Sequence, residues 1–391
     1  MRTRYEHTIT ACYIGYITQA IINNFAPLLF LTFQTSFDLR LEQITLLVTF
    51  NFLTQLVVDL LAAKFVDRIG YRPCVVAAHV FCAVGLIGLG VFPTILPPYA
   101  GLLAAVMVYA VGGGLIEVLI SPIVEACPSE NKSAAMSLLH SFYCWGTVAV
   151  VVLSTVLFSV LGIGQWRLVG CLWALVPAVN AVLFLRVPIA PIVEDGEGMS
   201  IGALFRQKIF WILALLMVCA GASEQAMSQW ASAFAESGLR VSKTIGDLAG
   251  PCFFSILMGT ARVVHSKLAE RVNLERYIVS CALLCIGSYV LAVLPLPPVL
   301  NLLGCGLCGF SVGVFWPGTF SISTAKCPLG GTAMFALLAL AGDLGCSLGP
   351  TVVGFVSGAF SDVLKFGLAA AVIFPLLILF GVRLLWGRKT Q

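Results

Sequence analysis

Long apolar stretches make up most of the chain. Twelve of them are close to or above the ~20 residues that an α-helix needs to cross a bilayer, and they lie at residues 8–34, 43–63, 73–95, 98–126, 134–161, 166–187, 209–236, 245–265, 274–295, 297–325, 331–358 and 362–386. Charged residues are 10% of the chain, against about 25% in a typical soluble domain. Backbone groups in lipid must be paired within the segment, which favours helices. We therefore expect an all-α membrane protein with twelve transmembrane helices.

A polar stretch divides these spans into two groups of six. It is rich in proline, glycine and acidic residues and covers residues 188–208. We expect an N-terminal six-helix bundle at residues 1–187, a cytoplasmic linker at 188–208 with a short interfacial helix near 201–207, and a C-terminal six-helix bundle at 209–391.

The distribution of basic residues predicts the orientation. With the N-terminus inside, most of the 22 Lys and Arg residues fall in cytoplasmic segments. The exceptions are Arg40, Arg167, Arg240, Lys243 and Lys365. Cytoplasmic loops carry the excess of basic residues, so both termini and the linker are expected inside. The loops are short, which favours a bacterial inner membrane, and the basic residues form no patch for nucleic acid.

The two halves repeat each other at the cytoplasmic ends of their helices. Basic and acidic residues at 64–72 correspond to those at 267–276, and a Cys-Pro pair at 127–128 corresponds to one at 327–328. Internal repeats of this kind are typical of secondary transporters.

The first of these segments resembles a known family motif. Residues 67–72, DRIGYR, are similar to the loop motif between helices 2 and 3 of the major facilitator superfamily. The resemblance implies the major facilitator fold, in which helices 1, 4, 7 and 10 line a central cavity. It also implies that Asp67, Arg68 and Arg72 form a cytoplasmic gate, with Asp59 in the same network. The alternative is that they are solvated loop charges that set only the topology.

Three further segments resemble the fucose–proton symporter branch of that superfamily. They are residues 23–27 (NNFAP), 112–122 (GGGLIEVLISP) and 138–146 (LLHSFYCWG). The resemblance implies a proton-coupled sugar transporter. Asn24 stands where the branch has an acid, so neither fucose nor the same proton route carries over.

Glu117 is the leading candidate for ion coupling. It lies well inside the fourth span, where a carboxylate costs roughly 2.5–3.5 kcal/mol on insertion scales. A carboxyl that gains and loses a proton can link proton flow to a change of conformation. The other proton-coupling candidates are His140, Glu224 and Asp343. Two alternatives remain for Glu117: a permanently protonated structural residue, or a sodium ligand together with Ser121, since hard cations need oxygen ligands.

Amides and aromatic rings in the predicted cavity helices, together with two aromatic residues of the fifth span, are the candidates for substrate binding. Amides bond hydroxyl groups and rings stack on sugar faces. Gln19 and Asn23, and likewise Gln225 and Gln229, are four residues apart and share a helix face. The alternative is that these polar groups join helices, at about 0.6 kcal/mol each. The candidates are Gln19, Asn23, Asn24, Tyr143, Trp145, Gln225, Gln229, Trp230, Phe315 and Trp316.

These observations predict a monomeric secondary active transporter that works by alternating access with proton coupling. The predicted solute is small and polar, and a sugar is the favoured class. Two alternatives remain open: an efflux transporter for amphipathic or drug-like compounds, and a membrane sensor that binds a nutrient without transporting it. An enzyme is not expected, because the chain has no nucleophile–base pair, metal-ligand set or phosphate loop. No cofactor is expected beyond a coupling proton or sodium ion.

Overall fold

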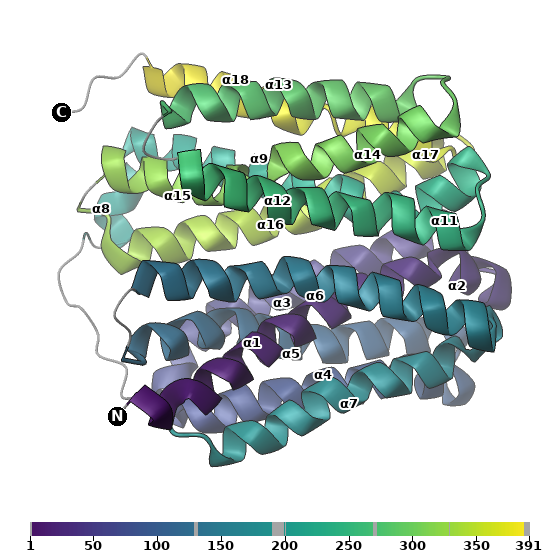
Figure 1. Ribbon diagram of the computed structural model, residues 1–391, viewed down its shortest axis with the longest axis horizontal. Coiled ribbons are helices and arrows are strands. Elements are labelled where there is room, and N and C mark those ends of the chain that lie inside the picture. Colours follow the sequence, from purple (N-terminus) through teal and green to yellow (C-terminus); the bar gives the residue numbers. More distant parts are fainter. Residues whose placement is uncertain are drawn as a thin grey trace. The chain divides into compact units, whose positions relative to one another are not determined.

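The computed structural model describes residues 2–128, 132–189, 199, 201–268, 272–327 and 329–386. Every regular element among them is a helix (Figure 1). Twelve helices in the described part of the chain are long and apolar enough to cross a membrane. The prediction of an all-α membrane protein with twelve spans is therefore confirmed.

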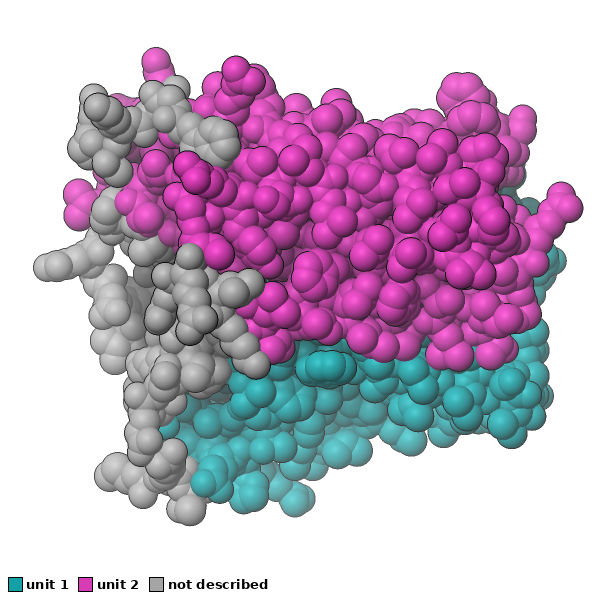
Figure 2. Space-filling model, turned by 45° about the horizontal axis from the view of Figure 1, so that its top comes forward, with its two compact units in different colours: residues 1–194 teal, residues 195–391 magenta. Residues whose placement is uncertain are grey.

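The chain forms two compact units, residues 1–194 and 195–391 (Figure 2). Their boundary lies inside the polar stretch that was predicted to be a linker. Most of that stretch, residues 190–198 and 200, lies outside the described residues. Its C-terminal part contains the short helix α8, Ile201–Arg206.

Unit 1 contains the first six spans. The first consists of α1 (Arg2–Asn24), the 3-10 turn η1 (Ala26–Leu29) and α2 (Phe30–Phe37); it is interrupted at Pro27, because proline cannot donate the hydrogen bond that continues an α-helix. The others are α3 (Leu41–Ile69), α4 (Tyr71–Ile95), α5 (Pro98–Ala126), α6 (Lys132–Leu161) and α7 (Trp166–Arg186), with the turn η2 (Ile163–Gln165) before α7.

Glycines bring α4 and α5 of unit 1 into close contact. A Cβ atom on Gly112 would lie 2.4 Å from the carbonyl oxygen of Ala78, and one on Gly85 would lie 2.5 Å from the amide nitrogen of Tyr109. Small residues of this kind let helix backbones approach closely in membranes. His79 lies in the same core, where its Nε2 accepts from Asn180 at 2.8 Å and its Nδ1 bonds the carbonyl of Val75 at 2.7 Å, as suits a structural histidine.

Unit 2 contains the other six spans, and four of them are interrupted. The seventh is α9 (Lys208–Ser228), α10 (Ala231–Ala233) and the π-helix η3 (Phe234–Gly238). The eighth is α11 (Lys243–Asp247), the π-helix η4 (Leu248–Cys252) and α12 (Phe253–Leu268). The ninth span is α13 (Leu274–Val293) and the eleventh is α16 (Gly331–Ala359). The tenth consists of α14 (Pro298–Val312) and α15 (Phe315–Lys326), and the twelfth of α17 (Leu364–Ala370) and α18 (Ile373–Trp386).

A row of glycines on α16 packs directly against α9. A Cβ atom on Gly345 would lie 1.9 Å from the carbonyl oxygen of Val218, and one on Gly349 would lie 2.3 Å from that of Ala222. The glycine–proline pair at residues 349–350 therefore serves helix packing. Trp230 completes this contact by donating from its indole nitrogen to the carbonyl of Pro350 at 3.0 Å.

Candidate functional site

A chain of amides joins α1 to α3 in the interior of unit 1. Gln19 Nε2 donates to Gln55 Oε1 at 2.8 Å, and Gln55 Nε2 donates to Asn23 Oδ1 at 3.0 Å and to Asn51 Oδ1 at 3.1 Å. Asn51 Nδ2 closes the chain by donating to Asn23 Oδ1 at 3.2 Å. All four side chains are buried. The predicted shared face of Gln19 and Asn23 therefore lies against a second polar face on α3.

Glu117 extends this chain to α5. Gln19 Nε2 also donates to Glu117 Oε2, at 3.3 Å, so that a single amide contacts both Gln55 and the carboxylate. The other end of that amide, Gln19 Oε1, is buried and has no hydrogen-bond partner among the described residues. The site thus contains an acceptor that a protonated carboxyl could use.

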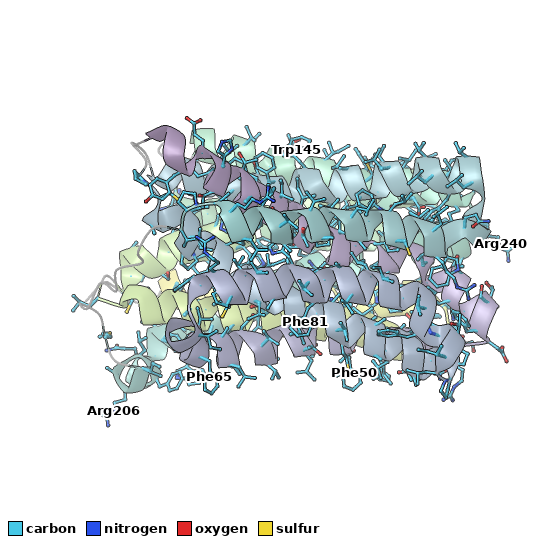
Figure 3. The ribbon with its side chains drawn as sticks, turned by 90° about the horizontal axis from the view of Figure 1, so that it is seen from below. Phe50, Phe65, Phe81, Trp145, Arg206 and Arg240 are labelled. Atoms are coloured by element: carbon cyan, nitrogen blue, oxygen red, sulfur yellow. The ribbon has the colours of Figure 1, made fainter. Side chains whose placement is uncertain are left out.

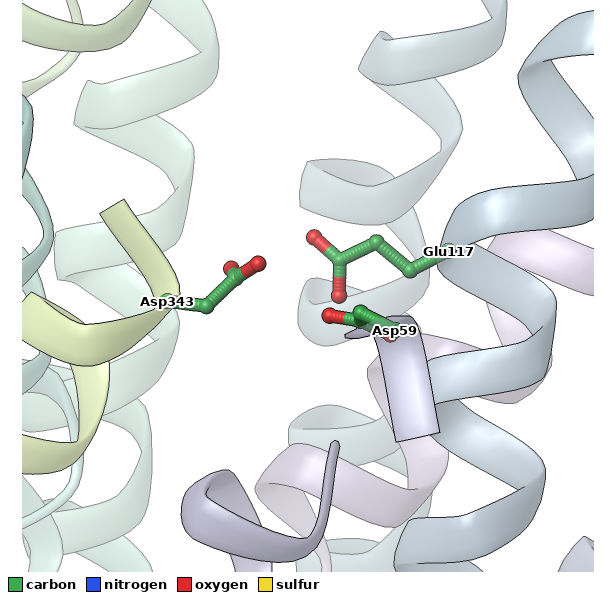
Figure 4. Close-up of side chains that lie close together, drawn as sticks. All are labelled: Asp59, Glu117 and Asp343. Atoms are coloured by element: carbon green, nitrogen blue, oxygen red, sulfur yellow. The ribbon is translucent and has the colours of Figure 1, made fainter. Parts of the chain in front are cut away.

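Asp59 lies beside Glu117. A carboxylate oxygen of each residue lies within 4.8 Å of the other (Figure 4). Asp59 is one helical turn beyond Gln55 on α3, and a Cβ atom on Gly114 would lie 2.8 Å from Asp59 Oδ1. Asp59 was assigned to the gate from sequence, and unit 1 places it next to the coupling candidate.

Tyr16 on α1 contacts both α5 and α6. The hydroxyl of Tyr16 bonds that of Ser121, one turn from Glu117 on α5, at 3.0 Å. The ring of His140 meets Tyr16 edge-on, with centroids 5.2 Å apart. His140 is exposed. Tyr16 therefore lies between the histidine and the helix that carries Glu117.

The remaining predicted residues of unit 1 have separate positions. Asn24 Nδ2 donates to the carbonyl of Ala20 at 2.9 Å and to Thr147 Oγ1 at 3.2 Å, which ties α1 to α6. Tyr143, one turn before Thr147, is half-buried. Trp145 is 50% exposed and lies at the edge of the ribbon (Figure 3).

The predicted gate is described only in part. The side chains of Asp67 and Arg68 lie outside the described residues. Arg72 donates from Nη1 to the carbonyls of Phe184 at 2.7 Å and Leu185 at 3.0 Å, in the last turn of α7. Cations bind helix C-termini well, so this arginine joins two helices of one unit.

Unit 2 has its own polar row, on α9. Gln229 Nε2 donates to Gln225 Oε1 at 3.1 Å, and Gln225 Nε2 donates to Glu224 Oε1 at 3.3 Å. The second oxygen of Glu224 lies 3.9 Å from Nη2 of Arg262 on α12. The predicted shared face of Gln225 and Gln229 is thus linked to a carboxylate and an arginine.

The aromatic candidates of unit 2 differ in burial. Trp230 is 0% exposed and Phe315 is 1% exposed, and their predicted role in substrate binding stays a prediction. Trp316 is half-buried and lies over Gly342, where a Cβ atom would come 2.3 Å from its ring. Asp343 follows Gly342 on α16 and is the third residue labelled in Figure 4.

Three polar residues of these sites were missed in the sequence. Asn51 and Gln55 lie four residues apart in the second span, the same signal that identified Gln19 and Asn23. Arg262 was counted among the cytoplasmic basic residues, whereas it lies within a candidate span, residues 243–265. Its position three residues inside the end of that span was the available signal.

Comparison with known protein families gives a match over most of the chain. Residues 12–350 match the sequence model of the Major Facilitator Superfamily. A comparison with curated protein sequences finds no match.

Solved structures of transporters share the fold over the whole chain. A bacterial homologue of the human lysosomal transporter Spinster is 15% identical with a TM-score of 0.81, covering 100% of this chain and 98% of its own. A D-xylose–proton symporter is 13% identical with a TM-score of 0.77, covering 98% and 97%. The E. coli fucose–proton symporter FucP is 16% identical with a TM-score of 0.65, covering 97% and 99%. At these identities the likeness concerns the fold.

Proposed function

Because the chain belongs to the major facilitator superfamily, we propose that it is a secondary active transporter of a small polar solute of the sugar class, driven by protons through Glu117. Alternating access about a midplane site is the mechanism expected for such folds. Two of the similar structures are sugar–proton symporters, which favours this class of solute over an amphipathic drug.

The observation that carries the proposal is the hydrogen bond between Gln19 and Glu117. It places an ionisable group of α5 at the end of an amide chain that also joins α1 and α3. Ionisable residues at membrane depth are expensive and are retained for ion or solute pathways. A change in the charge of Glu117 therefore acts on three helices at once.

Protonation would give the carboxyl group of Glu117 a hydrogen to donate. An ionised carboxylate only accepts, whereas a protonated carboxyl must donate one hydrogen. Gln19 Oε1 is a buried acceptor with no partner among the described residues. For it to accept from Glu117, the amide must rotate, which removes its donor from Gln55. Proton binding is thus linked to the contact between α1 and α3.

His140 is proposed to exchange this proton with water. Histidine titrates near neutral pH, and His140 is exposed while it contacts Tyr16. The hydroxyls of Tyr16 and Ser121 lie between it and the turn that carries Glu117. Glu224 and Asp343 remain predicted as further coupling residues.

Amide and aromatic groups are proposed to bind the solute. The candidates beside the coupling residues are Gln19 and Tyr143 in unit 1, and Gln225, Gln229 and Trp316 in unit 2. Asn23 and Asn24 are proposed to orient α1, because their side chains bond other residues of unit 1.

The test is solute-evoked charge movement on supported membranes with purified, reconstituted protein. Hexoses, pentoses and their acid derivatives form the panel, at several pH values and with or without sodium. We expect a pH gradient to drive accumulation in the wild type. In Glu117→Gln we expect that accumulation to disappear while exchange of bound solute continues. Glu6→Gln, an exposed glutamate on α1, is the matched control.

Uphill accumulation that survives in Glu117→Gln would exclude this residue as the coupling group. Accumulation that requires sodium and ignores the pH gradient would replace the proton with sodium.

A further inference from the structure

Glu224 and Arg262 form a charged pair within the spans of unit 2. Glu224 lies in the middle of the span at residues 208–238, and Arg262 lies inside the span at 243–265. Two other ion pairs among the described residues, Lys243–Asp247 and Lys326–Glu275, lie at helix ends. Charges at membrane depth are costly and usually face a pathway.

The charged groups of this pair are close enough to attract each other but do not form a hydrogen bond with each other. Arg262 Nη2 lies 3.9 Å from Glu224 Oε2, whereas a charge-assisted N–H···O bond is about 2.7–2.9 Å long. Glu224 is 6% exposed, and its Oε2 accepts no hydrogen bond within the described part of the chain. A buried pair stabilises a fold only when its geometry is good and its remaining polar atoms are satisfied.

The carboxylate of Glu224 also belongs to the polar row of α9. Its Oε1 accepts from Gln225, which in turn accepts from Gln229. A hydroxyl-rich solute would find amide donors and acceptors along this row and a guanidinium at its end. Arginine is suited to such a position, because its planar fork matches a carboxylate in two parallel hydrogen bonds.

We propose that Arg262 is a specificity-determining residue that binds a carboxylate of the solute, with Glu224 as the internal group that this carboxylate displaces. The solute is then a polyhydroxylated monocarboxylate such as a hexuronate or an aldonate. This inference rests on the proposed transport function and narrows its sugar class to sugar acids. Once Glu224 is displaced, the single positive charge of Arg262 can pair with one carboxylate, whereas a phosphate dianion would leave one of its two negative charges unpaired.

The test is equilibrium binding to purified full-length protein, measured by calorimetry at one pH and one ionic strength. The probes are matched pairs: galacturonate with galactose, glucuronate with glucose, and gluconate with glucitol. We expect at least one acid to bind about tenfold or more tightly than its neutral partner, because hydrogen bonds to charged groups are the stronger ones.

Three variants separate recognition from folding. Arg262→Gln should abolish the preference for the acid and leave weak binding of the neutral partner, and Arg262→Lys should retain only part of the preference, because it keeps the charge without the fork. Glu224→Gln should change affinity in the opposite direction, tightening binding of the acid about threefold or more, because the competing carboxylate is gone. Arg383→Gln, at an exposed arginine of α18, is the control.

Failure of this inference differs from failure of the proposed function. Equal binding of acids and neutral partners, no binding of any acid, or a preference that survives Arg262→Gln would overturn the role of Arg262. Tight acid binding with transport that ignores the proton gradient would leave Arg262 as the carboxylate receptor and refute proton coupling. Proton-driven uptake of a neutral hexose, with no preference for its acid, would support proton coupling and refute the role of Arg262 as a carboxylate receptor.

Discussion

Gln55 is the residue on which the polar interior of unit 1 depends most. Its side chain accepts from Gln19 and donates to Asn23 and Asn51, so that one amide serves three others. Leaving a buried polar group without its partner costs about 1–3 kcal/mol. The amide chain is consequently a set of mutually dependent bonds.

We expect Gln55→Leu to lower the stability of the protein in detergent by about 1–3 kcal/mol, because Gln19 and Asn23 both lose a partner in a buried position. Thermal unfolding followed by intrinsic fluorescence measures the change. Gln165→Leu, at an exposed turn residue, should leave the midpoint unchanged. Equal midpoints for Gln55→Leu and the wild type would show that the amide chain does not hold the helices together.

Asn24 stands where the fucose–proton symporter branch has an acid, and its amide makes hydrogen bonds within unit 1. Its amide donates to the carbonyl of Ala20 and to Thr147, which an ionised acid could not do because a carboxylate only accepts. The sequence indicated that an acid was missing here. Only the structure showed that this amide joins α1 to α6 by a hydrogen bond.

At the scale of elements, the contact between α9 and α16 is set by glycine. Gly345 lies so close to α9 that a Cβ atom would come within 1.9 Å of the Val218 carbonyl oxygen. A clash with backbone cannot be relieved by moving a flexible side chain. The two helices must separate if any larger residue is introduced.

We expect Gly345→Ala to destabilise the protein by about 1–3 kcal/mol, the usual cost of overpacking. Gly287→Ala is the matched control, because a Cβ atom on that glycine of α13 meets no atom within 4 Å. In an open helical position alanine stabilises by roughly 0.5–1 kcal/mol relative to glycine. Opposite shifts in the unfolding midpoint would support the packing described, and equal shifts would contradict it.

At the scale of the whole molecule, the charge distribution predicts the orientation in the membrane. Most basic residues fall on one side of the spans, the side that faces the cytoplasm in membrane proteins. Arg262 lies inside a span, so it no longer counts among the cytoplasmic basic residues. The excess of basic residues on that side remains without it, and the predicted orientation is unchanged.

We expect a green fluorescent protein fused after Gln391 to fluoresce and an alkaline phosphatase fused there to be inactive, because the C-terminus is predicted to be cytoplasmic. A phosphatase fusion between residues 164 and 165, in the loop before α7, should be active. The opposite pattern would show that the orientation is inverted.

The sequence by itself determined the twelve helices, their division near residues 188–208 and the presence of Glu117, Glu224 and Asp343 inside apolar spans. These features follow from length and hydropathy, which the bilayer imposes on each segment separately. Shared faces within one helix, such as that of Gln225 and Gln229, were also predictable, because helical periodicity is a local property.

Only the tertiary structure decided which of these faces meet. It joined Gln19 to Gln55 and Glu117, and it brought Arg262 to Glu224 from another helix. It also placed Trp230 and Phe315 in the packed core of unit 2. Such pairings depend on how helices rotate and pack against one another, and composition and periodicity leave that choice open because several faces of an apolar helix can be buried equally well.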